Sequence, residues 1–131
     1  MAARLTVVLL DYTLYLWHVL THRTPWLWRF HLVHHVDLDL DATTGLSDRT
    51  ERLLSSVVAT PRMHTIPHST DPAHLHSNFS SGLAIWDRLH GTALVVKPDD
   101  LAVGVAGYLS PPVSLGRALT LPFEVPSPHS G

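Results

Sequence analysis

Residues 18–35 read HVLTHRTPWLWRFHLVHH and contain five of the chain's eleven histidines. They form an HxxxH motif followed by an HxxHH motif, made by His18, His22, His31, His34 and His35. Side chains three or four residues apart lie on the same face of a helix. Neutral imidazole is the commonest protein nitrogen ligand for transition metals. The stretch therefore predicts two helices that hold a metal centre between them.

The composition restricts the chemistry available to the chain. It has 131 residues, enough for one small domain. Cysteine is absent, which excludes disulfide bonds, thiolate catalysis, zinc–thiolate sites and iron–sulfur clusters. The formal net charge is −2 and there is no run of Lys or Arg, so we expect no nucleic-acid partner. Any metal must be held by His, Asp, Glu or water.

The segment before the first histidine is almost wholly apolar. Residues 4–20 lack Pro and Gly, and only Asp11 interrupts their apolar character strongly. The segment is at the lower limit of length for crossing the hydrocarbon core of a bilayer. We interpret it as a helix that is embedded in a membrane or lies on one. A buried helix of a soluble protein is the alternative.

A second helix is expected to carry the HxxHH motif. Pro25 fits the first turn of a helix, so we expect the first helix to break at residues 23–25 and a new one to run to His35. The aromatic residues of this helix suit a membrane–water interface or an ordinary protein core equally well. They are Trp26, Trp28 and Phe30.

A third group of histidines follows in residues 61–69, PRMHTIPHS. His64 and His68 repeat the spacing of four residues, but Pro67 lies between them. Proline removes a helix donor and moves the preceding residue out of the helical region, so we expect no regular helix here. His64 and His68 are nevertheless candidate ligands. His74 and His76, in the following polar loop, are weaker candidates.

Three further helices are expected outside the histidine motifs. Ser47 is a plausible cap for a helix over residues 48–60, with Glu51 and Arg52 in water. The apolar side of that helix would be Leu53, Leu54, Val57 and Val58. Ser77 or Asn78 would cap a helix over residues 79–92, with Gly91 at its end. A short helix is possible at residues 115–121, and His90 and His129 are not expected to be ligands.

The motifs together resemble a known family. HVLTH, then HLVHH with an Asp-rich stretch and TT, then RMHTIPHS leading to NFSSGLAIWDRLHGT are similar to the sterol desaturase / fatty acid hydroxylase superfamily. The resemblance covers roughly residues 8–123. The family consists of integral membrane, non-haem di-iron oxygenases with the signature HxxxH, HxxHH, HxxHH. Carried over by position, it implies as iron ligands His18, His22, His31, His34, His35, His64 and His68.

The resemblance also implies a fold and a function. The fold would be all-α, a membrane-associated helical domain over residues 1–123 with an irregular Pro-rich C-terminal tail, disordered over residues 124–131. The chain would bind two iron ions and use O₂ as co-substrate to hydroxylate or desaturate a fatty acyl or sterol C–H bond in lipid biosynthesis. Its partners would be a membrane lipid and an electron donor protein or reductase, and its location integral to the membrane.

Ligand histidines also need acceptors for their remaining N–H groups, because these hydrogen bonds fix the imidazole rings. Four aspartates are candidates for this role. They are Asp11, Asp37, Asp41 and Asp87. Asp11 lies on the same predicted helix face as His18, so it is also a candidate ligand, or it caps or pairs locally.

The chain departs from the family signature in two places. Pro67 stands where the third motif has a histidine. Only 28 residues, 36–63, separate the second motif from the third, where family members usually have a helical hairpin and further histidines. The chain therefore resembles an internally shortened member. A degenerate, inactive fragment of the family and a soluble histidine-rich metal-binding module are the alternatives.

Overall fold

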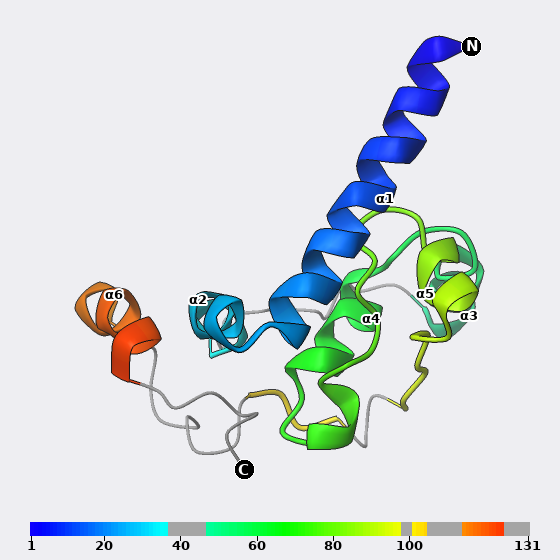
Figure 1. Ribbon diagram of the computed structural model, residues 1–131. Helices are drawn as coiled ribbons and strands as arrows, with labels where there is room; N and C mark the ends of the chain where they lie inside the picture. Colours follow the sequence, from blue (N-terminus) through cyan, green and yellow to red (C-terminus); the bar gives the residue numbers. More distant parts are fainter. Residues whose placement is uncertain (37–46, 98–100, 105–113, 125–131) are drawn as a thin grey trace.

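A computed structural model describes residues 1–36, 47–97, 101–104 and 114–124. These residues are mostly helical and contain no strand, which confirms the all-helical prediction for them. In chain order the elements are α1 (Ala2–Arg23), α2 (Pro25–His35), α3 (Asp48–Leu54), α4 (Pro61–Thr65), the 3₁₀ turns η1 (Ile66–His68) and η2 (Pro72–His74), α5 (Ile85–His90) and α6 (Leu115–Glu124) (Figure 1). The predicted division into residues 1–123 and a tail stays a prediction, since residues 125–131 lie outside the described part.

The break between the two histidine-bearing helices lies where the sequence predicts it. Thr24 has an extended backbone, and Pro25 occupies the first turn of α2, where its missing N–H leaves no hydrogen bond unmade. The chain can therefore turn sharply, and α2 packs against the C-terminal part of α1. Figure 1 shows the N-terminal turns of α1 projecting beyond the other helices.

The projecting half of α1 is apolar and uncovered. Leu5, Val7 and Leu9 are each more than half exposed, so this half of α1 is not buried within the chain, whereas Tyr15 and His22 in the other half are. None of the helices in the described ranges combines enough length with enough apolar character to cross a membrane.

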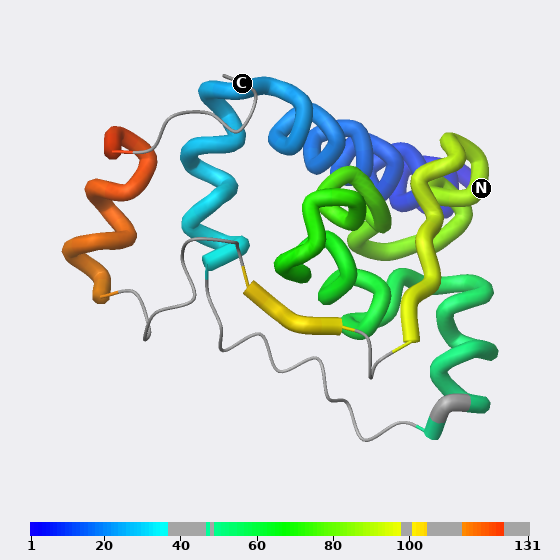
Figure 2. Tube along the Cα trace, turned by 90° about the horizontal axis from the view of Figure 1, so that it is seen from below, coloured from blue at the N-terminus to red at the C-terminus, as the bar shows by residue number. Residues whose placement is uncertain are grey.

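A small apolar core lies between α2 and α6. Trp28, Leu32 and Val36 are buried against Leu121, and the ring of Phe30 meets that of Phe123 edge to face at 6.0 Å. The predicted C-terminal helix is thus confirmed, and it covers one side of α2 (Figures 1 and 2). Of the aromatic residues of α2, Trp28 is 2% exposed and belongs to this core, whereas Trp26 is 63% exposed.

The prediction for α3 is right about its start and wrong about its end, which is Leu54 and not residue 60, and about its buried face. Ser47 caps the helix, its hydroxyl accepting from the backbone N–H of Thr50. Glu51, expected in water, is 5% exposed and accepts a hydrogen bond from the Thr60 hydroxyl. Leu53, expected to pack, is 65% exposed. Thr60 is the N-terminal cap of α4. Its hydrogen bond to Glu51 therefore joins α4 to α3 and turns the Glu51 side of α3 inward.

The predicted helix over residues 79–92 is also wrong in its first half. Only Ile85–His90 is helical, ended as predicted by Gly91 in the left-handed region at φ 71°. Asn78 does not cap it: at φ 49°, its side chain bonds the backbone of Met63 and Leu94. These long-range hydrogen bonds compete with helix formation. We call residues 79–84 the connecting loop.

Asp11 fixes the connecting loop to α1. Its Oδ2 accepts from the backbone N–H of Leu83 at 3.0 Å and from Trp86 Nε1 at 2.7 Å. One expectation placed Asp11 beside the histidines, as a metal ligand or as an acceptor for their N–H groups. The structure places its carboxylate against the connecting loop and Trp86 instead. Gly82 lies so close to Asp11 that an added Cβ would collide with Oδ1.

We expect Gly82→Ala to lower the free energy of unfolding by about 1–3 kcal/mol, because the Asp11 carboxylate must move and weaken its two hydrogen bonds. Urea unfolding measures the change. Gly116→Ala on α6 is the matched control, since nothing lies within 4 Å of the added Cβ there. Equal stability of the Gly82 variant and the wild type would contradict the role of this contact.

Candidate metal centre

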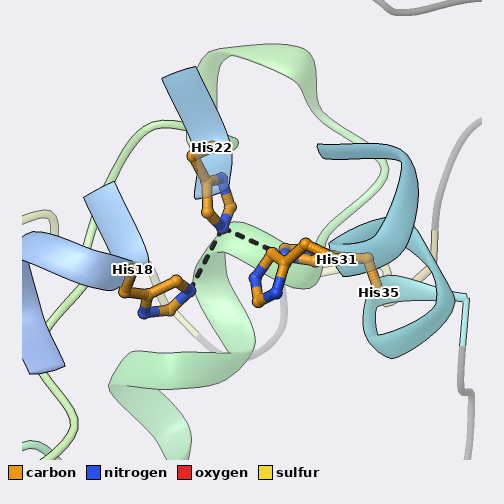
Figure 3. Close-up of side chains that lie close together, drawn as sticks. All are labelled: His18, His22, His31 and His35. Atoms are coloured by element: carbon orange, nitrogen blue, oxygen red, sulfur yellow. Dashed lines mark hydrogen bonds between the residues drawn. The ribbon is translucent and has the colours of Figure 1, made fainter. Parts of the chain in front are cut away.

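Four histidines from α1 and α2 point toward one another (Figure 3). We call them the four-histidine group: His18 and His22 from α1, His31 and His35 from α2. The Nε2 atom of His22 lies 3.2 Å from that of His18 and 3.1 Å from that of His35. One nitrogen from each of the four rings lies within 4.8 Å of the others.

Three further histidines form a second group beside the first. We call His34, His64 and His68 the three-histidine group. The Nε2 atom of His64 lies 3.2 Å from that of His34 and 3.3 Å from that of His68. The ring of His68 stacks on that of His35 with centroids 3.9 Å apart, so the two groups touch. The structure thus brings together all seven histidines named from the sequence.

The backbone around Pro67 is irregular, as predicted. The helix α4 ends at Thr65, and residues 66–68 continue as a 3₁₀ turn that contains the proline. This change of helix type still leaves His64 and His68 facing the same point. His34 is exposed and His64 half-buried, so this group is the more open of the two.

The donor set and its geometry fit metal ions. Two nitrogens that bind one ion at about 2.1 Å, with angles of about 90° to 109°, lie about 3.0–3.4 Å apart. Four Nε2 pairs, two in each group, are 3.1–3.3 Å apart. The Nε2 atom of His31 is buried without a hydrogen-bond partner, which is costly unless another ligand takes its lone pair. All-imidazole groups suit iron, zinc, copper or nickel.

The electrostatics keep these imidazoles neutral. Burial, followed by repulsion from neighbouring imidazoles, lowers the pKa of His22 to about 2, of His31 to about 3, of His64 to about 4 and of His68 to about 2. Burial also lowers the pKa values of His18 and His35. Neutral rings have a free lone pair on one nitrogen, which metal binding requires.

The ring of His18 is oriented by the connecting loop. Its Nδ1 lies 2.8 Å from the carbonyl oxygen of Phe79. A carbonyl only accepts, so Nδ1 carries the proton and the lone pair of Nε2 faces the four-histidine group. Sequence reasoning missed this contact, because a backbone carbonyl leaves no signal in the residue type.

Asp87 fixes the position of that carbonyl. Its carboxylate is fully buried and accepts from the backbone N–H groups of Phe79 at 2.8 Å and Ser80 at 3.0 Å, and from the Thr92 hydroxyl at 2.7 Å. Asp87 therefore acts on His18 through the loop and does not touch a histidine of the two groups itself.

We expect Asp87→Asn to lower the free energy of unfolding by about 1–3 kcal/mol, since the amide NH₂ would face a backbone N–H that needs an acceptor. Metal affinity should fall by about tenfold to hundredfold, because the support of His18 is disturbed. Urea unfolding and metal titration measure the two effects. Asp71→Asn, at an exposed carboxylate outside both groups, is the control. An unchanged metal affinity would contradict the link from Asp87 to His18.

The remaining candidates lie outside the two groups. His74 bonds the Ser69 hydroxyl through Nδ1 at 2.7 Å, and its Nε2 is 3.7 Å from Asp71. The ring of His76 lies 6.2 Å from that of His22. His90 lies within 3.1 Å of the Tyr12 hydroxyl and its ring stacks on that of Tyr12. Asp37, Asp41 and His129 lie outside the described residues.

Part of the sequence matches a known protein family. The sequence model of the family described as fatty acid hydroxylase matches residues 3–55. The matched segment contains the HxxxH and HxxHH motifs and ends before His64. No solved structure matches the chain. The match covers less than half of the chain and is consistent with the sterol desaturase / fatty acid hydroxylase superfamily, which the histidine motifs resemble.

Proposed function

We propose that this chain is a non-haem di-iron oxygenase that hydroxylates or desaturates a C–H bond of a fatty acyl or sterol lipid. The observation that carries the proposal is the convergence of seven imidazoles in two touching groups. The family match supports an oxidoreductase that acts on lipids.

The residues present have distinct roles in this proposal. When bound, two irons would supply the activation of O₂ needed to attack an alkyl C–H bond, which no side chain can supply. The four-histidine group would hold one ion and the three-histidine group the other. The stacked rings of His35 and His68 would fix how the two groups sit beside each other. Burial of His22, His35 and His68 excludes water from the side where the groups meet.

An apolar cavity beside α1 supports an alkyl chain as substrate. It measures about 630 Å³ and lies between the N-terminal half of α1 and the connecting loop. Its walls include Val7, Val8, Val58 and Leu83. Asp11, at one end, precedes His18 by seven residues, which is about 10 Å along a helix. A chain in this cavity would lie along the same helix that carries the first two histidines.

The same helix supports a membrane location. We propose that the exposed apolar side chains of α1 contact lipid, which would let a lipid substrate reach the cavity without entering water. An electron donor protein or reductase would supply the reducing equivalents. Flotation of the protein with phosphatidylcholine vesicles tests the membrane location, and recovery of folded protein only in the vesicle-free fraction would overturn it.

The decisive experiment combines metal analysis with turnover. Protein purified in detergent should contain two irons per chain and convert a fatty acyl or sterol lipid only when O₂ and a reductant are present. Absence of stoichiometric metal would overturn the proposal. Two bound metals without turnover of any lipid would favour the inactive fragment of the family, which the loss of a histidine at Pro67 also favours.

We expect Pro67→His to raise the affinity of the three-histidine group for a metal ion. Position 67 follows His64 by three residues, so a histidine there would add a fourth imidazole near the three-histidine group. After dialysis against a chelator, the metal content measured by mass spectrometry should be higher in this variant than in the wild type. Pro72→His, at an exposed proline outside both groups, is the control. Equal metal content in the Pro67 variant and the wild type would show that the third motif is not part of a site.

A further inference from the structure

A second cavity lies near α4, apart from the histidines. It measures about 480 Å³. Met63 and Ile66 line it, whereas His64 and His68 of the same segment face the three-histidine group. Successive helical residues turn by about 100°, so the two pairs lie on different faces of the segment. Residues of α3, Ser55, Arg62, Arg88 of α5 and the segment 93–97 complete the walls. The cavity is therefore distinct from the candidate metal centre.

The cavity concentrates positive charge. Four of the chain's nine Lys and Arg residues line it, although the formal net charge of the chain is −2. They are Arg52, Arg62, Arg88 and Lys97. Among the described residues, the one carboxylate that lines the cavity is that of Glu51, which is buried and already accepts from Thr60. The lining thus has an excess of positive charge.

Part of this charge is held in place before any ligand arrives. Arg88 donates from Nη1 to the carbonyl of Ser56 and from Nη2 to the carbonyl of Ser55, each at 2.5 Å. Its position is thereby fixed beside the end of α3, and a guanidinium has further N–H donors. A fixed donor loses little freedom on binding, so it favours an anion more than a mobile side chain does.

The rest of the lining is apolar. Met63 and Ile66 are nearly buried, and Leu94, Val95 and Val96 lie beside them. A ligand that matches both parts has an anionic group and a compact apolar body. A singly charged carboxylate would balance only part of the positive charge of three guanidiniums and one ammonium. A phosphate monoester carries a charge of about −1.5 to −2 and three acceptor oxygens, which matches this set of donors.

We propose that this cavity binds a phosphate monoester carried on a compact apolar group. The site does not depend on the metal centre, so its failure and that of the proposed function are separable. The ligand is either a free organic phosphate or the phosphate headgroup of a membrane lipid, and both offer the same chemistry to the four cations.

Titration calorimetry of the intact protein with hexyl phosphate tests the site. Hexanoate and inorganic phosphate are the comparison ligands, since each lacks one feature of the proposed ligand. We expect hexyl phosphate to bind at least about tenfold more tightly than either, and its affinity to fall as salt is added. Absence of hexyl phosphate binding, or equally tight binding of hexanoate, would overturn the proposal.

Two exposed cations allow a matched set of variants. Arg52→Gln and Lys97→Gln should each weaken hexyl phosphate binding by about threefold to tenfold without loss of the fold. Arg49→Gln is the control, because Arg49 lies on the same helix as Arg52, is exposed and does not line the cavity. Equal weakening by Arg49→Gln and Arg52→Gln would mean a diffuse charge effect, and would overturn the site.

Vesicles distinguish the two sources of the phosphate. If a lipid headgroup is the ligand, phosphatidic acid added to phosphatidylcholine vesicles should increase binding of the protein, and Arg52→Gln should remove the increase. Tight binding of hexyl phosphate without any effect of phosphatidic acid would support the site with a free organic phosphate as its ligand. Iron content should be the same in all these variants.

Discussion

Replacing His22 with alanine should remove one of two bound metal ions and leave the other. His22 is fully buried, and its Nε2 is the atom that lies close to both His18 and His35. Loss of a residue that only supports a ligand typically weakens metal binding tenfold to hundredfold, so loss of a ligand should weaken it by more than about hundredfold. Metal content per chain and a titration with Co²⁺, followed by its absorption spectrum, measure this loss.

Two further variants make the result specific. His64→Ala should remove the ion of the three-histidine group and leave that of the four-histidine group. His90→Ala, at an exposed histidine that contacts Tyr12, should leave both. Unchanged metal content in the His22 variant would show that the four-histidine group holds no metal. Loss of both ions in either variant would show that the two groups are not separate positions.

The metal-free protein should lose stability steeply as the pH falls below about 6.5. In the folded chain the pKa values of His22, His31 and His68 are about 2, 3 and 2, while unfolded histidines titrate near about 6.5. Below about pH 6.5 the unfolded chain therefore binds more protons than the folded one. Each such histidine lowers the free energy of unfolding by about 1.4 kcal/mol per pH unit until its own folded pKa is reached.

Several histidines titrate together, so the loss exceeds the usual stability of a small domain before the pH reaches about 4. Urea unfolding at a series of pH values measures the slope. His64→Gln should reduce the slope between about pH 6.5 and 4, because it removes a group whose folded pKa is about 4. A flat profile between about pH 7 and 5 would contradict the burial of these rings as neutral groups.

The features that local sequence determines were predicted well. Pro25 and the spacing of the first two motifs specify the break between α1 and α2 and the common face of their histidines. These signals act within a few residues, so they depend little on distant contacts. Pro67 likewise indicates the irregular backbone near His68, and Gly91 the end of α5.

The features that were missed depend on contacts between distant residues. Asp11 and Trp86 are 75 residues apart in the chain, and their hydrogen bond helps to hold residues 79–84 out of a helix. Glu51 is buried because Thr60 lies beside it, which reverses the face expected from the apolar residues of α3. Asp87 was named among four candidate acceptors, and only its hydrogen bonds to Phe79 and Ser80 reveal how it acts.

The unbroken length of α1 has a mechanical consequence. The helix runs from Ala2 to Arg23, about 33 Å, with its uncovered half at one end and His18 and His22 near the other. The hydrogen bond between Asp11 of α1 and Trp86 of α5 lies between these two ends. Because the helix is unbroken between its ends, a tilt of the outer turns about this contact would displace His18 and His22 in the opposite direction.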